Sequence, residues 1–175
     1  MKTKLVIPAL LALALLPLAG RAFADTNADV ERVRSATEPY VTRVGAAEKA
    51  GYGRFVDAAG IACIEQPGLG GMGIHYVDGE LVGDAVLDPA RPEALVYEQR
   101  LFGYLRLAAV EYIVFKSVWE AAGHTSPPTL FGVPFDFTPS PNRYGIPAFY
   151  ALHAWIWKPN PAGMFMPWNP RVDCP

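Results

Sequence analysis

Two long runs of apolar residues dominate the second half of the chain, and both predict β-strands. The first run is Leu105 to Phe115 (LRLAAVEYIVF), and the second is Phe149 to Lys158 (FYALHAWIWK). Both runs are rich in β-branched and aromatic residues, which favour strands. Pro159 and Pro161 end the second run, because proline cannot donate a hydrogen bond to a sheet ladder. We expect the rest of the chain to surround this second strand.

Side chains alternate between the two faces of a strand, so each run can be divided into faces. One face of the second run would carry Phe149, Ala151, His153, Trp155 and Trp157. A single histidine, His153, thus lies within an aromatic face. In the first run the odd-numbered residues form the more apolar face, and Glu111 lies in the middle of it. A carboxylate in that position costs several kcal/mol unless it is paired, hydrogen-bonded or bound to a metal.

Shorter strands are predicted before these two runs. Met72 to Val77 (MGIHYV) reads as a strand with His75 on the side opposite Ile74 and Tyr76, and residues 94–98 (ALVYE) form another. The glycine-rich stretch at residues 66–73, which leads into the predicted Met72–Val77 strand, lacks the spacing of a phosphate-binding loop. Its glycines instead indicate a tight turn or a close approach between two backbones.

Residues 25–51 have the apolar periodicity of helices. Val30 and Val33 share a face before Pro39, and apolar residues recur at helical spacing after it: Tyr40, Val41, Val44, Ala47 and Ala50. Thr37 could cap the second segment, with Pro39 in its first turn. Two helices, or one helix broken at Pro39, both fit the pattern. Either would pack across a sheet through its apolar stripe.

The remaining segments are rich in proline and glycine. We predict a long ordered loop at residues 123–147, with aromatic residues interleaved, and an irregular tail at residues 164–174 that wraps the body. The chain therefore runs from helices to several strands joined by turns, with no internal repeat. This order favours an α+β fold, in which an N-terminal helical segment packs on a curled antiparallel sheet.

The first 24 residues have the features of a secretory signal peptide. Basic Lys2 and Lys4 precede a short apolar run, and Ala22-Phe23-Ala24 is a small-x-small cleavage site. The apolar run is too short to span a bilayer, so we expect no stable membrane anchor. Cleavage after Ala24 would leave one exported domain, residues 25–175, either periplasmic or secreted.

Charge and composition limit the kinds of partner that this protein could bind. Without the three basic residues of the leader, 12 basic and 17 acidic residues remain, a net charge of −5, and there is no basic run. This balance argues against nucleic acid and anionic membranes as partners. The low charged fraction and 12% aromatic content favour a compact domain over a disordered chain.

The chain has two cysteines, Cys63 and Cys174. In an exported protein this even number predicts a disulfide, which would tie the C-terminal tail to the start of the core. A bridge of this kind contributes roughly 2–4 kcal/mol. The alternative, a pair of metal ligands, lacks a histidine next to either cysteine.

The candidate residues for a binding or catalytic site are His75, Glu111 and His153. Two histidines and a carboxylate from separate strands of a sheet could converge as a small site for a transition metal ion. A small apolar ligand is the other candidate for this site, since aromatic residues of the 123–147 loop could line a pocket. In the structural alternative, Glu111 pairs with Arg106, Tyr76 or His75, while His153 donates to a backbone carbonyl between tryptophans.

Two further function classes stay open. One is an enzyme that uses Glu111 as a buried general base, with a pKa raised by desolvation and a histidine partner. The other is a structural or interaction protein without a small-molecule site, whose aromatic loop contacts a partner. Nucleophilic catalysis has little support, because no GxSxG motif is present. Convergence of the three side chains would favour a binding site or enzyme, and separate packed positions would favour the structural protein.

Five motifs are spread along the chain: GGMGIHYV, RPEALVYE, VEYIVF, LHAWIWKPNPAGMF and WNPRVDC. Together they resemble a widespread family of small exported bacterial proteins of unassigned function, and the resemblance extends from the helical residues 40–51 to Cys174. The resemblance implies an exported single-domain protein. It supplies no catalytic residues.

Overall fold

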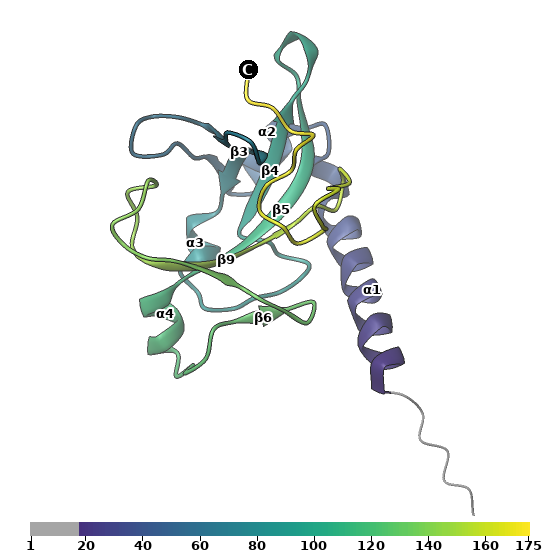
Figure 1. The fold of residues 1–175 in the computed structure, drawn as a ribbon, viewed down its shortest axis with the longest axis vertical. Helices are drawn as coiled ribbons and strands as arrows, with labels where there is room; N and C mark the ends of the chain where they lie inside the picture. Colours follow the sequence, from purple (N-terminus) through teal and green to yellow (C-terminus); the bar gives the residue numbers. More distant parts are fainter. Residues whose placement is uncertain (1–17) are drawn as a thin grey trace, which may run out of the picture.

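The computed structural model describes the backbone of residues 18–175 and the side chains of residues 26–175. Most of the predicted signal peptide lies outside these described residues. The fold is α+β with an antiparallel sheet, as predicted (Figure 1). The helical elements are α1 (Leu18–Thr37), η1 (Glu38–Tyr40), α2 (Val44–Lys49), α3 (Gly79–Val82), η2 (Leu101–Gly103) and α4 (Lys116–Ala121). The strands are β1 (Gly53–Arg54), β2 (Cys63–Gln66), β3 (Gly70–Val77), β4 (Ala94–Gln99), β5 (Leu105–Phe115), β6 (Thr129–Leu130), β7 (Val133–Pro134), β8 (Asp136–Thr138) and β9 (Phe149–Ala154).

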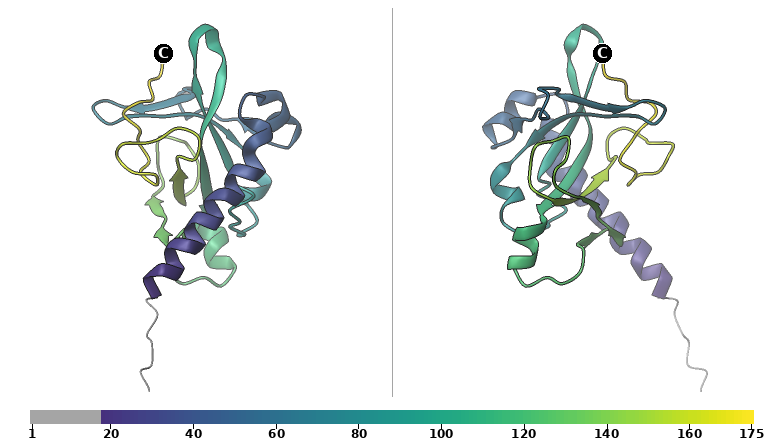
Figure 2. Two further views of the ribbon diagram at one scale, coloured as in Figure 1. Left: turned by 90° about the vertical axis from the view of Figure 1, so that its right-hand side faces the viewer. Right: turned by 60° about the vertical axis from the view of Figure 1, so that its left-hand side comes forward.

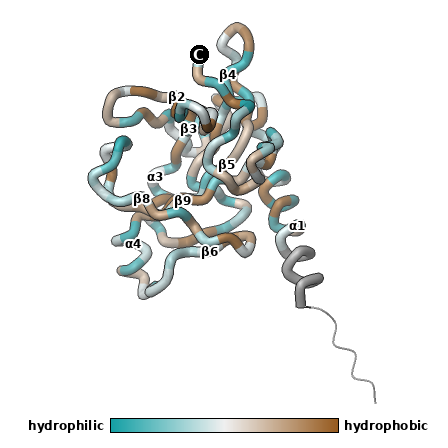
Figure 3. Tube along the Cα trace, in the orientation of Figure 1, coloured by the Kyte–Doolittle hydropathy of each residue, from teal (hydrophilic) through white to brown (hydrophobic). Residues whose placement is uncertain are grey.

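The main sheet has seven strands. Six of them follow the order β1-β3-β4-β5-β9-β8, and the seventh, β2, pairs with β3. Strands β3, β4 and β5 follow each other as antiparallel neighbours, and β9 then pairs with the free side of β5. The central strand β5 is coloured largely as hydrophobic in Figure 3, whereas the described part of α1 carries both kinds of residue. The curl of the sheet stays a prediction, because the strand order alone does not test it.

The N-terminal helices cover the sheet. In the left view of Figure 2, α1 crosses in front of the strands. Val30 and Val33 of α1 and Ala47 of α2 belong to the same buried cluster as Leu95 of β4. The helical segment breaks at the position that Pro39 predicted. The first helix, α1, ends at Thr37, and η1 begins at Glu38 with Pro39 in its first turn.

Thr37 occupies the N-cap position of η1, as predicted, but its side chain does not form the cap. Its hydroxyl makes no capping hydrogen bond to η1. Instead, Thr37 Oγ1 donates to the Val33 carbonyl at 2.7 Å and accepts from Trp157 Nε1 at 3.0 Å. A threonine hydroxyl in a helix can donate to the carbonyl four residues earlier. The same hydroxyl oxygen can also accept a hydrogen bond, and here it accepts one from the Trp157 indole.

A bulge in β5 corrects the predicted division into faces. Val96 pairs with Ala109 and Tyr97 pairs with Leu107, so the residue between, Ala108, has no partner on β4. An extra residue of this kind moves all earlier side chains to the opposite face. Leu107 consequently packs in the main core with Val110, and the odd-numbered residues do not form one continuous apolar face.

The second predicted strand is shorter than expected. β9 ends at Ala154, not at Lys158, because the chain then leaves the ladder. The amides of Trp157 and Lys158 both donate to the Ala108 carbonyl at 3.0 Å, which places this segment across the β5 bulge. Trp157 therefore packs against the main core and does not share a face with His153.

The segment 123–147 is more regular than the predicted loop. It contains β6 and β7, which form a two-stranded sheet, and β8, which extends the main sheet beside β9. Phe131 and Phe135 of this segment are buried in the main core. The remainder of the segment is held by Asn142, whose side-chain amide donates to two carbonyls.

The C-terminal tail is pinned to the body, as predicted, through contacts with β2 and β3. The Cys63–Cys174 disulfide is present. The Gly71 amide donates to the carbonyls of Asn169 and Val172, and the Asn169 amide donates back to the Gly71 carbonyl. A Cβ atom on Gly71 would lie only 2.8 Å from the Val172 carbonyl oxygen, so glycine is required for this close approach.

Candidate metal centre

The three predicted site residues come from three strands of the sheet and meet on one face. Glu111 of β5 is directly opposite His153 of β9, so their side chains are cross-strand neighbours. His75 lies on β3, with β4 between it and Glu111. The β4 residue paired with Glu111 is Ala94, whose methyl group leaves room for the long side chains of His75 and Glu111 to meet above β4.

Contacts within the cluster are short. His75 Nε2 lies 3.2 Å from one carboxylate oxygen of Glu111, and His153 Nδ1 lies 3.2 Å from the other. The two imidazole rings meet edge to face with their centroids 5.6 Å apart. His75 is 6% exposed, Glu111 is 7% exposed and His153 is 3% exposed, so the cluster is shielded from solvent.

The buried Glu111 carboxyl remains ionised. Burial by itself would raise the pKa of Glu111, but the charges and hydrogen bonds of His153 and His75 outweigh it and hold the pKa below the usual range. The raised pKa expected for a general base is therefore wrong. The prediction counted desolvation and one histidine partner, whereas the fold supplies two histidines whose charges and hydrogen bonds outweigh desolvation.

One nitrogen of the cluster has no partner. His153 Nε2 is buried and makes no hydrogen bond within the described part of the chain. The ring is nearly parallel to the indole of Trp155, with centroids 6.0 Å apart, so its orientation is fixed by packing. An unpaired buried polar atom is costly. The nitrogen of His153 that faces Glu111 is Nδ1, so an ion shared with Glu111 through Nδ1 would leave Nε2 unpaired.

The donor atoms are close enough to share one cation. One potential ligand atom from each of His75, Glu111 and His153 lies within 4.8 Å of the others. Metal–nitrogen and metal–oxygen bonds are about 2.0–2.2 Å long, so ligands of one ion lie roughly 3–3.5 Å apart. Small side-chain movements would bring these atoms to that spacing. The three residues thus converge, as the metal-site interpretation requires, and the Glu111–His75 contact also fits the structural alternative in which these two residues pair.

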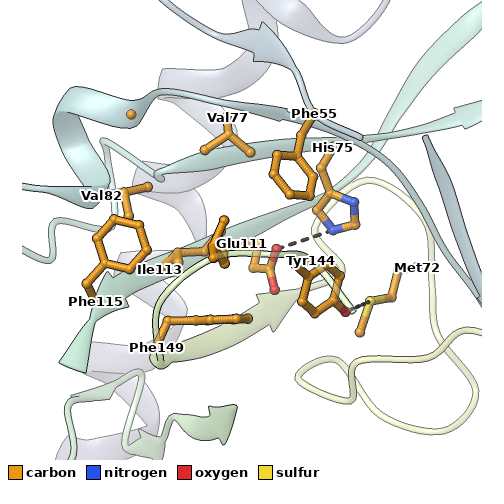
Figure 4. Close-up of a pocket in the computed structure, with 12 residues that line it drawn as sticks. Phe55, Met72, His75, Val77, Val82, Glu111, Ile113, Phe115, Tyr144 and Phe149 are labelled. Atoms are coloured by element: carbon orange, nitrogen blue, oxygen red, sulfur yellow. Dashed lines mark hydrogen bonds and ion pairs between the residues drawn. The ribbon is translucent and has the colours of Figure 1, made fainter. Parts of the chain in front are cut away.

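An apolar pocket opens beside the cluster (Figure 4). The cavity has a volume of about 130 Å³. Its walls come from β3, α3, β5 and β9 and from the loop before β9, and the main apolar side chains are Phe55, Val82, Ile113, Phe115, Ile146 and Phe149. The titratable residues that line the pocket are His75, Glu111 and Tyr144.

Tyr144 and Met72 complete the polar side of the pocket. Figure 4 shows the Tyr144 ring beside Glu111, with its hydroxyl turned toward the Met72 sulfur. The Tyr144 Oη–Met72 Sδ distance is 3.9 Å, and a thioether is only a weak acceptor. Burial, with the nearby Glu111 charge, raises the pKa of Tyr144 to about 12, so the hydroxyl stays protonated.

The loop that carries Tyr144 is anchored by its neighbour. Arg143 Nη2 donates to Asp57 at 2.9 Å, and Asp57 also accepts from the amides of Ala59 and Ile61. The Arg143 hydrogen bond, these amides and the guanidinium charge together lower the pKa of Asp57. The segment before β9 is therefore fixed over the pocket by a charge-assisted contact.

Other predicted partners lie elsewhere. Tyr76 packs in the main core, so of the alternatives considered for Glu111 only His75 contacts it. The third histidine, His124, is exposed and stacks on Trp119 at 3.6 Å. The cysteines form the disulfide and are not metal ligands.

Sequence reasoning missed Glu93, a fully buried carboxyl. Glu93 Oε2 accepts from the Ile113 amide at 3.0 Å, whereas Oε1 has no partner among the described residues. It follows Pro92 in a turn, and no local pattern separates it from a surface glutamate. The sequence also gave no sign that Phe55 and Val82 would line a pocket with His75.

Comparison with known proteins gives this chain no relative. No family model, no curated protein and no solved structure matches it. The resemblance to small exported bacterial proteins therefore stays a prediction. Among the helices in the described part of the chain, none has the length and apolar character needed to cross a membrane.

Proposed function

We propose that this protein binds a transition metal ion through His75, Glu111 and His153. The observation that carries the proposal is the convergence of three buried donor atoms within 4.8 Å of one another. Separate, fully packed positions would have favoured a structural protein, whereas these side chains meet in one cluster, of which His75 and Glu111 also line a pocket.

The donor set matches a particular class of metal site. Two imidazoles and one carboxylate suit zinc, iron and related first-row metals. Three protein ligands leave at least one coordination position free, as in sites that bind water or an organic ligand, while closed structural sites use four. The pocket beside Glu111 is the space into which the free position would open. A bound cation would also balance the buried charge of Glu111.

A role for Glu111 as general base has less support. A useful base has a pKa near the working pH, and the two histidines hold the pKa of Glu111 below its usual range. The same contacts prepare Glu111 as an anionic metal ligand.

Export is part of the proposal. The predicted leader, residues 1–24, and the Cys63–Cys174 disulfide both suit a protein that works outside the cytoplasm. In this setting the single domain, residues 25–175, would bind its metal as a periplasmic or secreted protein. A curled sheet, as the sequence predicts, would help to enclose the site.

The test is elemental analysis of the mature protein, purified without chelator or affinity metal and then incubated with zinc or copper. We expect about one metal per chain in the parent. His153→Ala should lose the metal, while His124→Ala should keep it because His124 lies on the surface. Circular dichroism checks that both variants fold, and Glu111→Gln provides a second site variant. Absence of metal from the folded parent after incubation overturns the proposal.

A further inference from the structure

We propose that the pocket beside the cluster binds a small, neutral, single-ring compound with one hydroxyl group, a phenol or a close relative. The hydroxyl would face His75, Glu111 and Tyr144, and the ring would lie among the apolar walls. This inference rests on the proposed function, because it names the organic ligand of the same site.

The size of the cavity selects a single ring. At about 130 Å³, the cavity is close to engineered apolar cavities of about 150 Å³ that bind benzene. A bicyclic or long-chain ligand would exceed this volume and would have to project through the mouth of the pocket. Phe115 and Phe149 flank the far side of the pocket from Glu111, as Figure 4 shows, and offer ring edges and faces to an aromatic ligand.

The lining selects a neutral ligand. Val82, Ile113 and Phe149 offer no partner to a charge, and an unpaired buried charge is costly. A cationic ligand would compete with the histidines that already pair with the Glu111 carboxylate, and it would be repelled by a bound metal ion.

The polar side of the pocket selects a hydroxyl group. Each Glu111 oxygen has two lone-pair sites and makes one contact with a histidine, so the carboxylate can accept a further hydrogen bond. Among the described residues, the hydrogen-bond partner of the Tyr144 hydroxyl is the weakly accepting Met72 sulfur, so a rotation of this hydroxyl would let it donate to a ligand oxygen. A hydroxyl both donates and accepts, and it therefore matches both groups.

Gly79 of α3 offers a way to fill the pocket without touching the cluster. It lines the cavity, and a Cβ atom on it would meet no heavy atom within 4 Å. A leucine side chain at this position would occupy the space of the ring. Gly45 of α2 is a matched control, because its Cβ would also meet no atom within 4 Å but it does not line the cavity.

The test is isothermal titration calorimetry of the mature protein, as purified and after metal removal, with phenol, toluene, benzoate and benzylamine. We expect phenol to bind at least about tenfold more tightly than toluene, because toluene cannot bond to the charged carboxylate. Gly79→Leu should weaken phenol binding at least about tenfold, and Gly45→Leu should leave it unchanged. Val82→Phe serves as a second filling variant.

The outcomes separate this inference from the metal proposal. Phenol that fails to bind at millimolar concentration overturns the inference, even if the protein holds a metal. Tighter binding of benzoate, benzylamine or toluene than of phenol overturns the assigned ligand class. Equal phenol binding by the parent and both filling variants overturns the assigned location. Phenol binding to a protein that takes up no metal supports the inference and overturns the metal proposal.

Discussion

The buried carboxyl of Glu93 makes a sharp prediction about stability and pH. The residue is 0% exposed, and among the described residues only one of its carboxyl oxygens has a side-chain hydrogen bond, which it accepts from the Ile113 amide. Burial raises the pKa of Glu93 from 4.5 to about 8, because the site lacks a strong positive partner. At neutral pH the folded protein therefore keeps this carboxyl largely protonated.

The direction of the pH effect follows from the two pKa values. In the unfolded chain the carboxyl ionises near 4.5, whereas in the folded protein it ionises near 8. Stabilisation by the protonated form is therefore complete below pH 4.5 and is lost as the pH rises through 8. The difference corresponds to about 5 kcal/mol at most, taking 1.36 kcal/mol for each pKa unit.

The variant Glu93→Gln removes the titration but keeps a side-chain oxygen for the Ile113 amide. We expect urea denaturation to show that the parent loses stability relative to Glu93→Gln between pH 5 and pH 9, by several kcal/mol. Glu120→Gln is the matched control, since Glu120 is half-exposed and pairs with Lys116 on α4; its pH profile should follow the parent. Parallel profiles for the parent and Glu93→Gln would refute the reasoning.

Two further predictions concern the attachment of the C-terminal tail. The double variant Cys63→Ala, Cys174→Ala opens a loop with a sequence separation of 111, so urea denaturation should show a loss of up to about 5 kcal/mol; an unchanged midpoint would contradict this. Gly71→Ala would place a methyl group 2.8 Å from the Val172 carbonyl oxygen, so its thermal midpoint should fall by several degrees, while Gly45→Ala should not lower it. Equal midpoints for the two alanine variants would show that the tail adjusts freely.

Much of the fold was readable from local pattern. The apolar run 105–115 coincides with β5, and the strand containing His75 lies where MGIHYV predicted it. Pro39 marks the break between helices, and the two cysteines predict the bridge that forms. These features depend on side-chain periodicity, backbone restriction at proline and cysteine number, all of which are properties of short stretches or of composition.

The types of residue at the candidate site were also readable. A carboxylate within an apolar strand requires a partner, and this requirement singled out Glu111. The sequence could not choose between Arg106, Tyr76 and His75 as that partner. The choice depends on the tertiary placement of the two faces of β3: His75 lies on the face that carries Glu111, whereas the adjacent Tyr76 packs in the main core.

Tertiary structure alone decided the chemistry of the site. The bulge at Ala108 reassigns the faces of β5, and no periodicity within the strand announces an unpaired residue. The charges of His75 and His153 reverse the effect of burial on Glu111, and the pocket joins Phe55, Val82 and Tyr144 from distant segments. The sequence by itself determined which residues needed partners. Which partners they found depended on long-range register and packing, because contacts between distant segments leave no periodic trace in the chain.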